Sequence, residues 1–317
     1  MFEVKQFPEM SWSLSRHKTL MNCQMQYFFT YYLSHNGWLQ KASSVSKHAY
    51  RLKKMVSTDI LLGNSVHKQI QQVIGHVQSE EKIQSESHLV ESIRADLNTA
   101  YVDSIHRRAQ WFEKPNKYSM LQEIYYDGRL TKEKIHDIQE RTRLSVNHFL
   151  SSRTFNVISL NQKVKIVDAE RVRVMKVDGI NIFAVLDLVY QDENGRYVIV
   201  DWKTGKERPD DFYQVVLYVW FLHEKLNIDL GEIEAKIEYL QIGKQKSIQV
   251  KQIDIDNMLN TFRMSMELMC GYIEDIEQNK PFGFEVFPKT QNPRTCSSCN
   301  YRELCSKSKG KRGFKSY

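Results

Sequence analysis

The chain has 317 residues, of which 41% are hydrophobic and 26% charged, which indicates a globular protein of one large domain or two average ones. Its longest apolar stretch, residues 215–222, is far short of the roughly 20 residues that span a bilayer, and residues 1–12 lack the pattern of a secretory signal, so we expect a cytoplasmic protein without a membrane anchor. The net charge of +7 favours a polyanionic partner.

The first half of the chain is predicted to be helical. Residues 11–33 are expected to form one amphipathic helix that begins at a serine cap and closes around Asn36-Gly37, and a second helix is expected from about Gly63. Residues 79–155 are polar with apolar residues at helical spacing, which predicts a helical insertion broken near Pro115.

The second half is predicted to hold one central sheet. From about Val157 the sequence favours strands, with turns at Asp178-Gly179 and at Glu193-Asn194-Gly195 and a last strand that ends at Trp202. The elements expected after this strand are a helix over 210–226, a strand pair within 233–255, a helix over about 256–278, and a proline-rich loop before a cysteine knuckle. This order predicts an α/β (α+β) fold with helices around a single sheet.

The hairpin before Trp202 carries two carboxylates and a lysine. Because strand side chains alternate between faces, Asp201 and Lys203 share a face that Trp202 does not. If the loop is the three residues 193–195, Asp187 lies opposite Asp201 on that same face, whereas a two-residue loop without a bulge turns Asp187 away. The hypothesis of one site therefore predicts an odd-length loop or a compensating bulge.

Two carboxylates at this spacing repel each other unless a divalent cation lies between them, and oxygen ligands select Mg²⁺ or Mn²⁺. Such a cation supports phosphodiester hydrolysis by activating water, and Lys203 is expected to orient that water or to neutralise developing charge. The main-chain carbonyl of Trp202 is a further candidate ligand. The alternative is a surface hairpin with an ordinary Asp-Lys pair.

Four of the five cysteines have the spacing of a ligand set: Cys296, Cys299 and Cys305 near the end of the chain, with Cys23 far away. Two thiolates separated by two residues can bind one centre from a tight turn, and four thiolates complete either a zinc site or an iron-sulfur cubane. Cys270 lies in an apolar segment and is predicted to be a core residue.

Further motifs resemble the RecB-like branch of the PD-(D/E)XK nuclease superfamily, whose iron-sulfur members include CRISPR-associated exonucleases and AddB-type nucleases. The hairpin is followed by Gln214-x3-Tyr218, similar to the Q-x3-Y helix motif of that branch, and Gly63-x3-His67 is similar to its G-x3-H motif. The resemblance implies that His67 is an additional metal ligand and that Gln214 and Tyr218 reach the active site or DNA. It also favours a structural 4Fe-4S cluster, with zinc as the alternative, at the four cysteines.

Two positions depart from the family pattern, since Gln24 stands where a proline is usual after the first cysteine and Ala184 where a glycine is common before the first carboxylate. The resemblance implies a restriction-endonuclease-like core with a mixed sheet. The expected division is 1–69 for the N-terminal helices, 70–156 for the helical insertion, 157–280 for the nuclease core, and 281–317 for the cluster-binding segment and basic tail.

The leading hypothesis is a metal-dependent DNA nuclease, an exonuclease that acts on ends or single strands. With no glycine-rich P-loop in the chain, unwinding is expected to come from a helicase or from a recombination or CRISPR integration partner. The candidate DNA contacts are Arg16, Lys307, Lys309, Lys311 and Arg312. The alternatives are a non-catalytic DNA-binding or adaptor subunit and a zinc-bound interaction module, while the sequence leaves the oligomeric state open.

Overall fold

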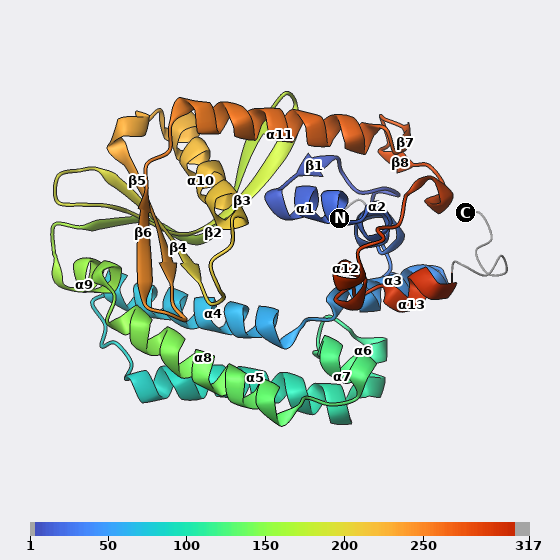
Figure 1. The fold of residues 1–317 in the computed structure, drawn as a ribbon, viewed down its shortest axis with the longest axis horizontal. Coiled ribbons are helices and arrows are strands. Elements are labelled where there is room, and N and C mark those ends of the chain that lie inside the picture. The colour runs from blue at the N-terminus through green and yellow to red at the C-terminus, as the bar shows by residue number, and fades with distance from the viewer. Residues whose placement is uncertain (1–3, 308–317) are drawn as a thin grey trace.

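A computed structural model describes residues 4–307, except for the side chains of Glu170, Arg171, Ser306 and Lys307. Its centre is a mixed six-stranded sheet with helices on both sides, as the sequence predicts (Figure 1). The strand order is β1-β3-β4-β5-β6, with β2 on β3. The bounds are β1 Ser11–Trp12, β2 Lys165–Val177, β3 Ile180–Gln191, β4 Tyr197–Lys203, β5 Ile233–Tyr239 and β6 Lys244–Ile248.

One face of the sheet is covered by α10 (Asp210–Leu226) and α11 (Gln252–Cys270), and the other by α4 (Thr58–Gln78) (Figure 1). Side chains alternate along β4. Val198, Val200 and Trp202 lie in the apolar cluster between the sheet and α4, while Ile199 lies in the cluster between the sheet and α10. Both sides of β4 are therefore buried, which explains why its sequence is almost continuously apolar.

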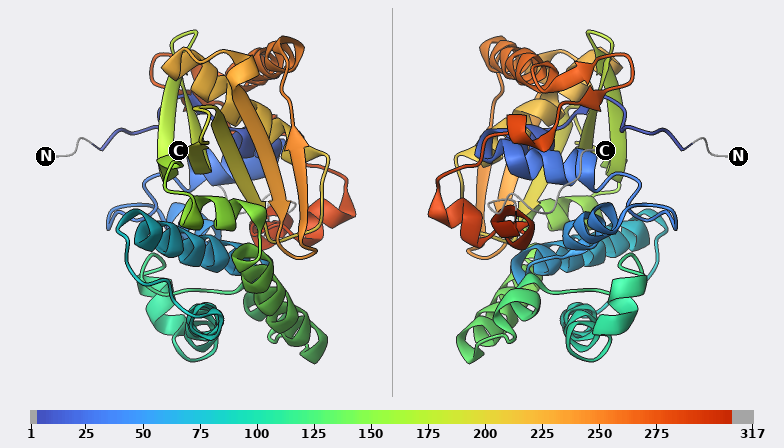
Figure 2. Two further views of the ribbon diagram at one scale, coloured as in Figure 1. Left: turned by 90° about the vertical axis from the view of Figure 1, so that its left-hand side faces the viewer. Right: turned by 90° about the vertical axis from the view of Figure 1, so that its right-hand side faces the viewer.

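The helical insertion packs beneath α4, on the side away from the sheet (Figures 1 and 2). The view from the side shows it as a separate lower layer of helices (Figure 2). Its helices are α5 Glu86–His106, α6 Arg108–Glu113, α7 Gln122–Asp127 and α8 Lys132–Leu150, followed by α9 Arg153–Leu160. The predicted break near Pro115 is confirmed, because α6 ends just before it.

The prediction of one helix over residues 11–33 is wrong. The segment forms β1, then α1 (Leu14–Asn22), α2 (Gln24–Phe28) and a π-helical turn (Phe29–Leu33). The break is at Cys23, whose backbone is extended and whose sulfur accepts the N–H of Gln26 at 3.4 Å, so the thiol itself caps α2. Proline favours the first position of a helix, and its replacement by Gln24 removed the sequence signal for this break.

Three other boundaries differ from the prediction. Residues 157–160 belong to α9 and not to a strand, because the Ser152 side chain caps that helix through the N–H of Phe155. Helix α4 begins at Thr58, before Gly63, and it runs across the expected boundary at residue 69. Helix α11 starts at Gln252 and ends at Cys270, and a small strand pair, β7 (Ile273–Asp275) with β8 (Lys280–Pro281), follows it.

The C-terminal segment contains a 3-10 turn (Phe284–Val286), α12 (Pro293–Ser297) and α13 (Arg302–Lys307), and another 3-10 turn (Leu230–Glu232) precedes β5. In the described part of the chain, no helix combines the length and apolar character needed to cross a bilayer.

Candidate active site and cysteine cavity

The loop between β3 and β4 has the odd length that the sequence predicts. Asp192 and Arg196 pair through their main chains at 2.9 Å, which leaves the three-residue loop 193–195 with Gly195 in the left-handed region at φ +81°. The register continues as Gln191 opposite Tyr197 and ends with Leu188 opposite Val200. Asp187 and Asp201 follow at the point where the two strands separate.

Beyond this point a hydrogen bond to the side chain of Asp187 replaces the main-chain pairing between β3 and β4. Its Oδ2 accepts the main-chain N–H of Trp202 at 2.8 Å, so a side chain closes the gap where the ladder has ended. The other edge of β4 remains fully paired with β5 as far as Lys203 opposite Tyr239. The end of β4 is thus held on both sides, and its backbone position is fixed.

A continuous row of polar contacts runs from Asp201 to α10. Lys203 Nζ lies 2.8 Å from Asp201 Oδ2 and donates to Gln214 Oε1 at 2.7 Å, and the Gln214 amide donates to the hydroxyl of Tyr218. Gln214 and Tyr218 are one helical turn apart, as the motif requires. The structure therefore brings these four predicted residues together.

Two contacts of Asp211 fix the start of α10 over the site. Its Oδ2 accepts the N–H of Arg208 at 2.9 Å and the hydroxyl of Tyr239 on β5 at 3.1 Å. These bonds hold Gln214 above Lys203. Tyr218 is 97% buried, since only 3% of its surface is exposed, so it supports Gln214 and does not itself reach DNA.

His67 approaches the carboxylates from α4. Its Nδ1 lies 3.3 Å from Asp187 Oδ1. A Cβ atom at Gly63, one turn earlier, would lie 3.2 Å from the Thr204 hydroxyl, which is tighter than ordinary van der Waals contact. The glycine of the G-x3-H pattern thus lets α4 pass close to the end of β4, and this approach brings His67 within reach of Asp187.

Asp201 is the most perturbed group of this site. It is completely buried, and burial raises the pKa of its carboxyl to about 7, with the nearby charge of Asp187 as the second cause. Lys203 and then His67 act in the opposite direction by favouring the charged form. Without a further positive charge, ionised Asp201 is therefore unfavourable in the folded chain.

This perturbation predicts how the stability of the metal-free protein depends on pH. A carboxyl whose folded pKa exceeds its unfolded value of about 3.9 binds protons more tightly when folded, so its contribution is lost as pH rises from about 4 to about 7. We expect the free energy of unfolding in chelator to fall over this window by an amount on the order of a few kcal/mol, and the melting temperature to fall with it. Asp201→Asn should flatten the fall, and an identical pH profile for both proteins would contradict the assignment.

The donor atoms suit a hard divalent cation. Lys203 pairs with Oδ2 of Asp201, but neither oxygen of this buried carboxylate accepts a hydrogen bond of good geometry, so its charge is only partly compensated. Carboxylate oxygens with an imidazole nitrogen fit Mg²⁺ or Mn²⁺. Within residues 4–307, no group of three or more His, Cys, Asp or Glu side chains is already arranged to hold a metal ion.

The four predicted cysteines line a single cavity of about 520 Å³ between the N-terminal helices and the C-terminal segment. These ends of the chain lie side by side (Figures 1 and 2), and the N–H of Met25 donates to the carbonyl of Pro288 at 3.0 Å. Cys23 is buried, Cys299 and Cys305 are partly buried, and Cys296 is exposed. The cavity is therefore built by residues from opposite ends of the sequence.

Two of the four thiols accept main-chain hydrogen bonds. Sulfur atoms of Cys23 and Cys299 accept main-chain N–H groups of Gln26 and Tyr301 at 3.4 and 3.3 Å, the kind of contact that supports thiolate ligands. Burial, with the other three cysteines as a lesser cause, raises the pKa of Cys299 to about 11, so a bound cation is needed to keep it a thiolate. Cys270 lies outside this cavity and is partly exposed, so its prediction as a core residue is wrong.

Of the candidate DNA contacts, Arg16 has a described side chain. Arg16 is buried, donates from Nη1 to the carbonyl and hydroxyl of Ser11, and has its guanidinium carbon 4.3 Å from the ring centre of Tyr31. Its position ties α1 to β1 and to the aromatic residues of the N-terminal helices. The main chain of Lys307 closes α13, whereas Lys309, Lys311 and Arg312 lie outside the described residues.

Sequence reasoning did not identify Glu238 as part of the site's support. Its Oε2 accepts the indole N–H of Trp202 at 2.8 Å, and its Oε1 accepts the hydroxyl of Thr154 at 2.5 Å. Alternation along β5 suggests an exposed residue at this position, yet the α9 side of the sheet is covered and Glu238 is buried. The Trp202 indole is thereby fixed on one face, while its main-chain N–H binds Asp187.

A family model and a solved structure match this chain. The family model described as the PD-(D/E)XK nuclease superfamily matches residues 11–306. A solved structure titled "Crystal structure of SSO0001" aligns with 13% identity and a TM-score of 0.31, over 78% of this chain and 95% of that one. The search among curated proteins gave no match.

Proposed function

Because the chain belongs to the PD-(D/E)XK nuclease superfamily, we propose that it is a Mg²⁺- or Mn²⁺-dependent deoxyribonuclease of the RecB-like branch. The observation that carries the proposal is the meeting of Asp187, Asp201 and Lys203 at the end of β4, with His67 and Gln214 in contact with them. Two buried carboxylates that repel each other destabilise the fold, so a purely structural role does not explain this pair.

In this proposal Asp187, Asp201, His67 and the carbonyl of Trp202 hold the cation. A divalent cation in such a site polarises a phosphate oxygen and lowers the pKa of bound water. Lys203 Nζ lies between Asp201 and Gln214, beside the carboxylates. From there it can orient a water molecule or neutralise charge on the phosphate in the transition state.

The four cysteines are proposed to hold a structural 4Fe-4S cluster, with zinc as the alternative. The support is the shared cavity together with the N–H groups that point at two of the sulfurs. Such a centre would join Cys23 to the C-terminal segment and so stabilise α1, α2 and α13 against one another. Hydrolysis needs no electron transfer, so its role is structural.

The preferred substrate is proposed to be a DNA end or a single strand, with a partner protein for any unwinding. The test uses end-labelled linear DNA, single- and double-stranded, beside circular single-stranded DNA, in Mn²⁺, Mg²⁺ or chelator. Metal-dependent loss of the linear substrates with the circle intact supports an exonuclease, and loss of the circle points to an endonuclease. DNA binding without cleavage in any metal would overturn the enzyme in favour of an adaptor subunit.

A further inference from the structure

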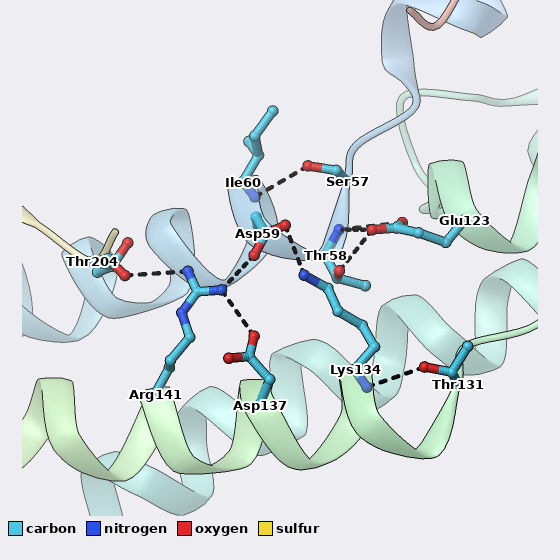
Figure 3. A network of polar contacts seen from close by, with 10 residues as sticks. All are labelled: Ser57, Thr58, Asp59, Ile60, Glu123, Thr131, Lys134, Asp137, Arg141 and Thr204. Atoms are coloured by element: carbon cyan, nitrogen blue, oxygen red, sulfur yellow. Dashed lines mark hydrogen bonds and ion pairs between the residues drawn. The ribbon is translucent and has the colours of Figure 1, made fainter. Parts of the chain in front are cut away.

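The helical insertion is connected to the end of β4 through one guanidinium group, that of Arg141 on α8 (Figure 3). Its Nη2 donates at 3.2 Å to the carbonyl of Thr204, the residue that follows Lys203. Its Nη1 binds Asp59 on the first turn of α4 and lies 3.2 Å from Asp137 on its own helix. One planar side chain therefore joins α4, α8 and the end of β4.

The contacts of Arg141 lie between α4 and the end of β4, the two elements that contribute residues to the proposed metal site. His67 comes from α4, and Asp201 and Lys203 come from β4. The two elements approach closely at Gly63 and Thr204, where the helix has no side chain to set the spacing. The bond from Arg141 to Thr204 holds the strand end, and the bond from Arg141 to Asp59 holds the helix, so their separation is set by a rigid fork.

Other polar contacts tie the insertion to the start of α4 without reaching Thr204. Lys134 donates to the second oxygen of Asp59 at 2.8 Å, and Glu123 of α7 accepts the N–H and hydroxyl of Thr58 at 3.0 and 2.7 Å (Figure 3). The Arg141 side chain is only 11% exposed, so water competes weakly for its hydrogen bonds. None of these residues contacts the carboxylates of the site in an observed bond.

We propose that Arg141 is a positioning residue of the nuclease site, which sets the spacing of His67 from Asp201 and Lys203 by binding α4 and the Thr204 carbonyl at once. This inference rests on the proposed function and gives the insertion a part in it. Residues that hold ligands in place typically change metal affinity or activity by about 10–100-fold when they are replaced. A misplacement of about 1 Å is enough for such an effect.

The test compares Arg141→Met and Arg141→Lys with Lys134→Met. Lys134→Met removes the other cation from Asp59 but no contact with Thr204, so it is a matched control for loss of charge and of insertion stability. Mn²⁺ binding is titrated calorimetrically without DNA, and kcat and KM are measured on linear DNA. We expect Arg141→Met to weaken Mn²⁺ binding by about 10-fold or more and to lower kcat with little change in KM.

Arg141→Lys should fall between the parent and Arg141→Met, because an ammonium keeps the charge but cannot bridge Asp59 and Thr204 as a planar fork does. Lys134→Met should bind Mn²⁺ as the parent does, even if it melts at a lower temperature. Equal Mn²⁺ affinity in Arg141→Met and Lys134→Met would overturn this inference and leave the nuclease proposal intact. A parent that neither binds Mn²⁺ nor cleaves DNA would overturn both.

Discussion

Lys203→Ala is expected to lower DNA cleavage by at least about 10²-fold while DNA binding persists. The Lys203 ammonium group pairs with the buried carboxylate of Asp201, and Gln214 holds it in place. Its removal takes away a positioned positive charge at the site where phosphate charge develops. Single-turnover cleavage of labelled DNA, with binding measured in chelator, separates the two effects.

Lys246→Ala is the matched control, because Lys246 lies on β6, two strands from β4, and pairs with Glu207 and not with Asp201. It removes the same charge from the protein, so a general loss of attraction for DNA would appear in both variants. If Lys203→Ala cleaves DNA as fast as Lys246→Ala, the assignment of Lys203 is wrong. A melting temperature close to that of the parent in both variants shows that neither result comes from unfolding.

Cys299→Ser is expected to remove the bound centre and to destabilise the protein. If the cavity holds an iron-sulfur cluster, the purified parent is brown with broad visible absorbance, and the variant loses both colour and iron. Since binding of such a centre contributes directly to folding, we expect a fall of roughly 10 °C in melting temperature. Anaerobic purification, metal analysis and thermal melting measure these changes.

Cys270→Ser provides the comparison, because this thiol lies outside the cavity and should leave colour, iron and stability nearly unchanged. A colourless parent with stoichiometric zinc that Cys299→Ser loses would replace the cluster by zinc at the same cysteines. Equal metal content in both variants would contradict any metal-binding role for Cys299.

The parts of the site that lie close together in sequence were predictable. The hairpin loop, the shared face of Asp201 and Lys203, and the position of Asp187 follow from strand alternation and from the left-handed Gly195. The helix over residues 210–226 has the observed bounds of α10, because a long apolar run begins with two aspartates and ends near Asn227. Local geometry determines all of these features.

Contacts between distant segments could not be predicted from local patterns. The bond from Arg141 to Thr204 depends on how α8 packs beneath α4, and no property of either residue indicates the pairing. Glu238 occupies a strand position that alternation assigns to solvent, and only the packing of α9 shows that it is buried. Cys23 ends α1 through a backbone conformation that its sequence neighbours do not require.

The position of Cys23 opposite Cys296, Cys299 and Cys305 also has a consequence for folding during synthesis. Cys23 is synthesised long before Pro288, the main-chain partner of Met25, and before the other three thiols of the cavity. The central sheet can pair and α10 can cover it while Cys23 is still uncovered. The metal centre proposed at these cysteines could therefore form only after Cys305 has been synthesised, and until then Cys23 lacks the other three thiols.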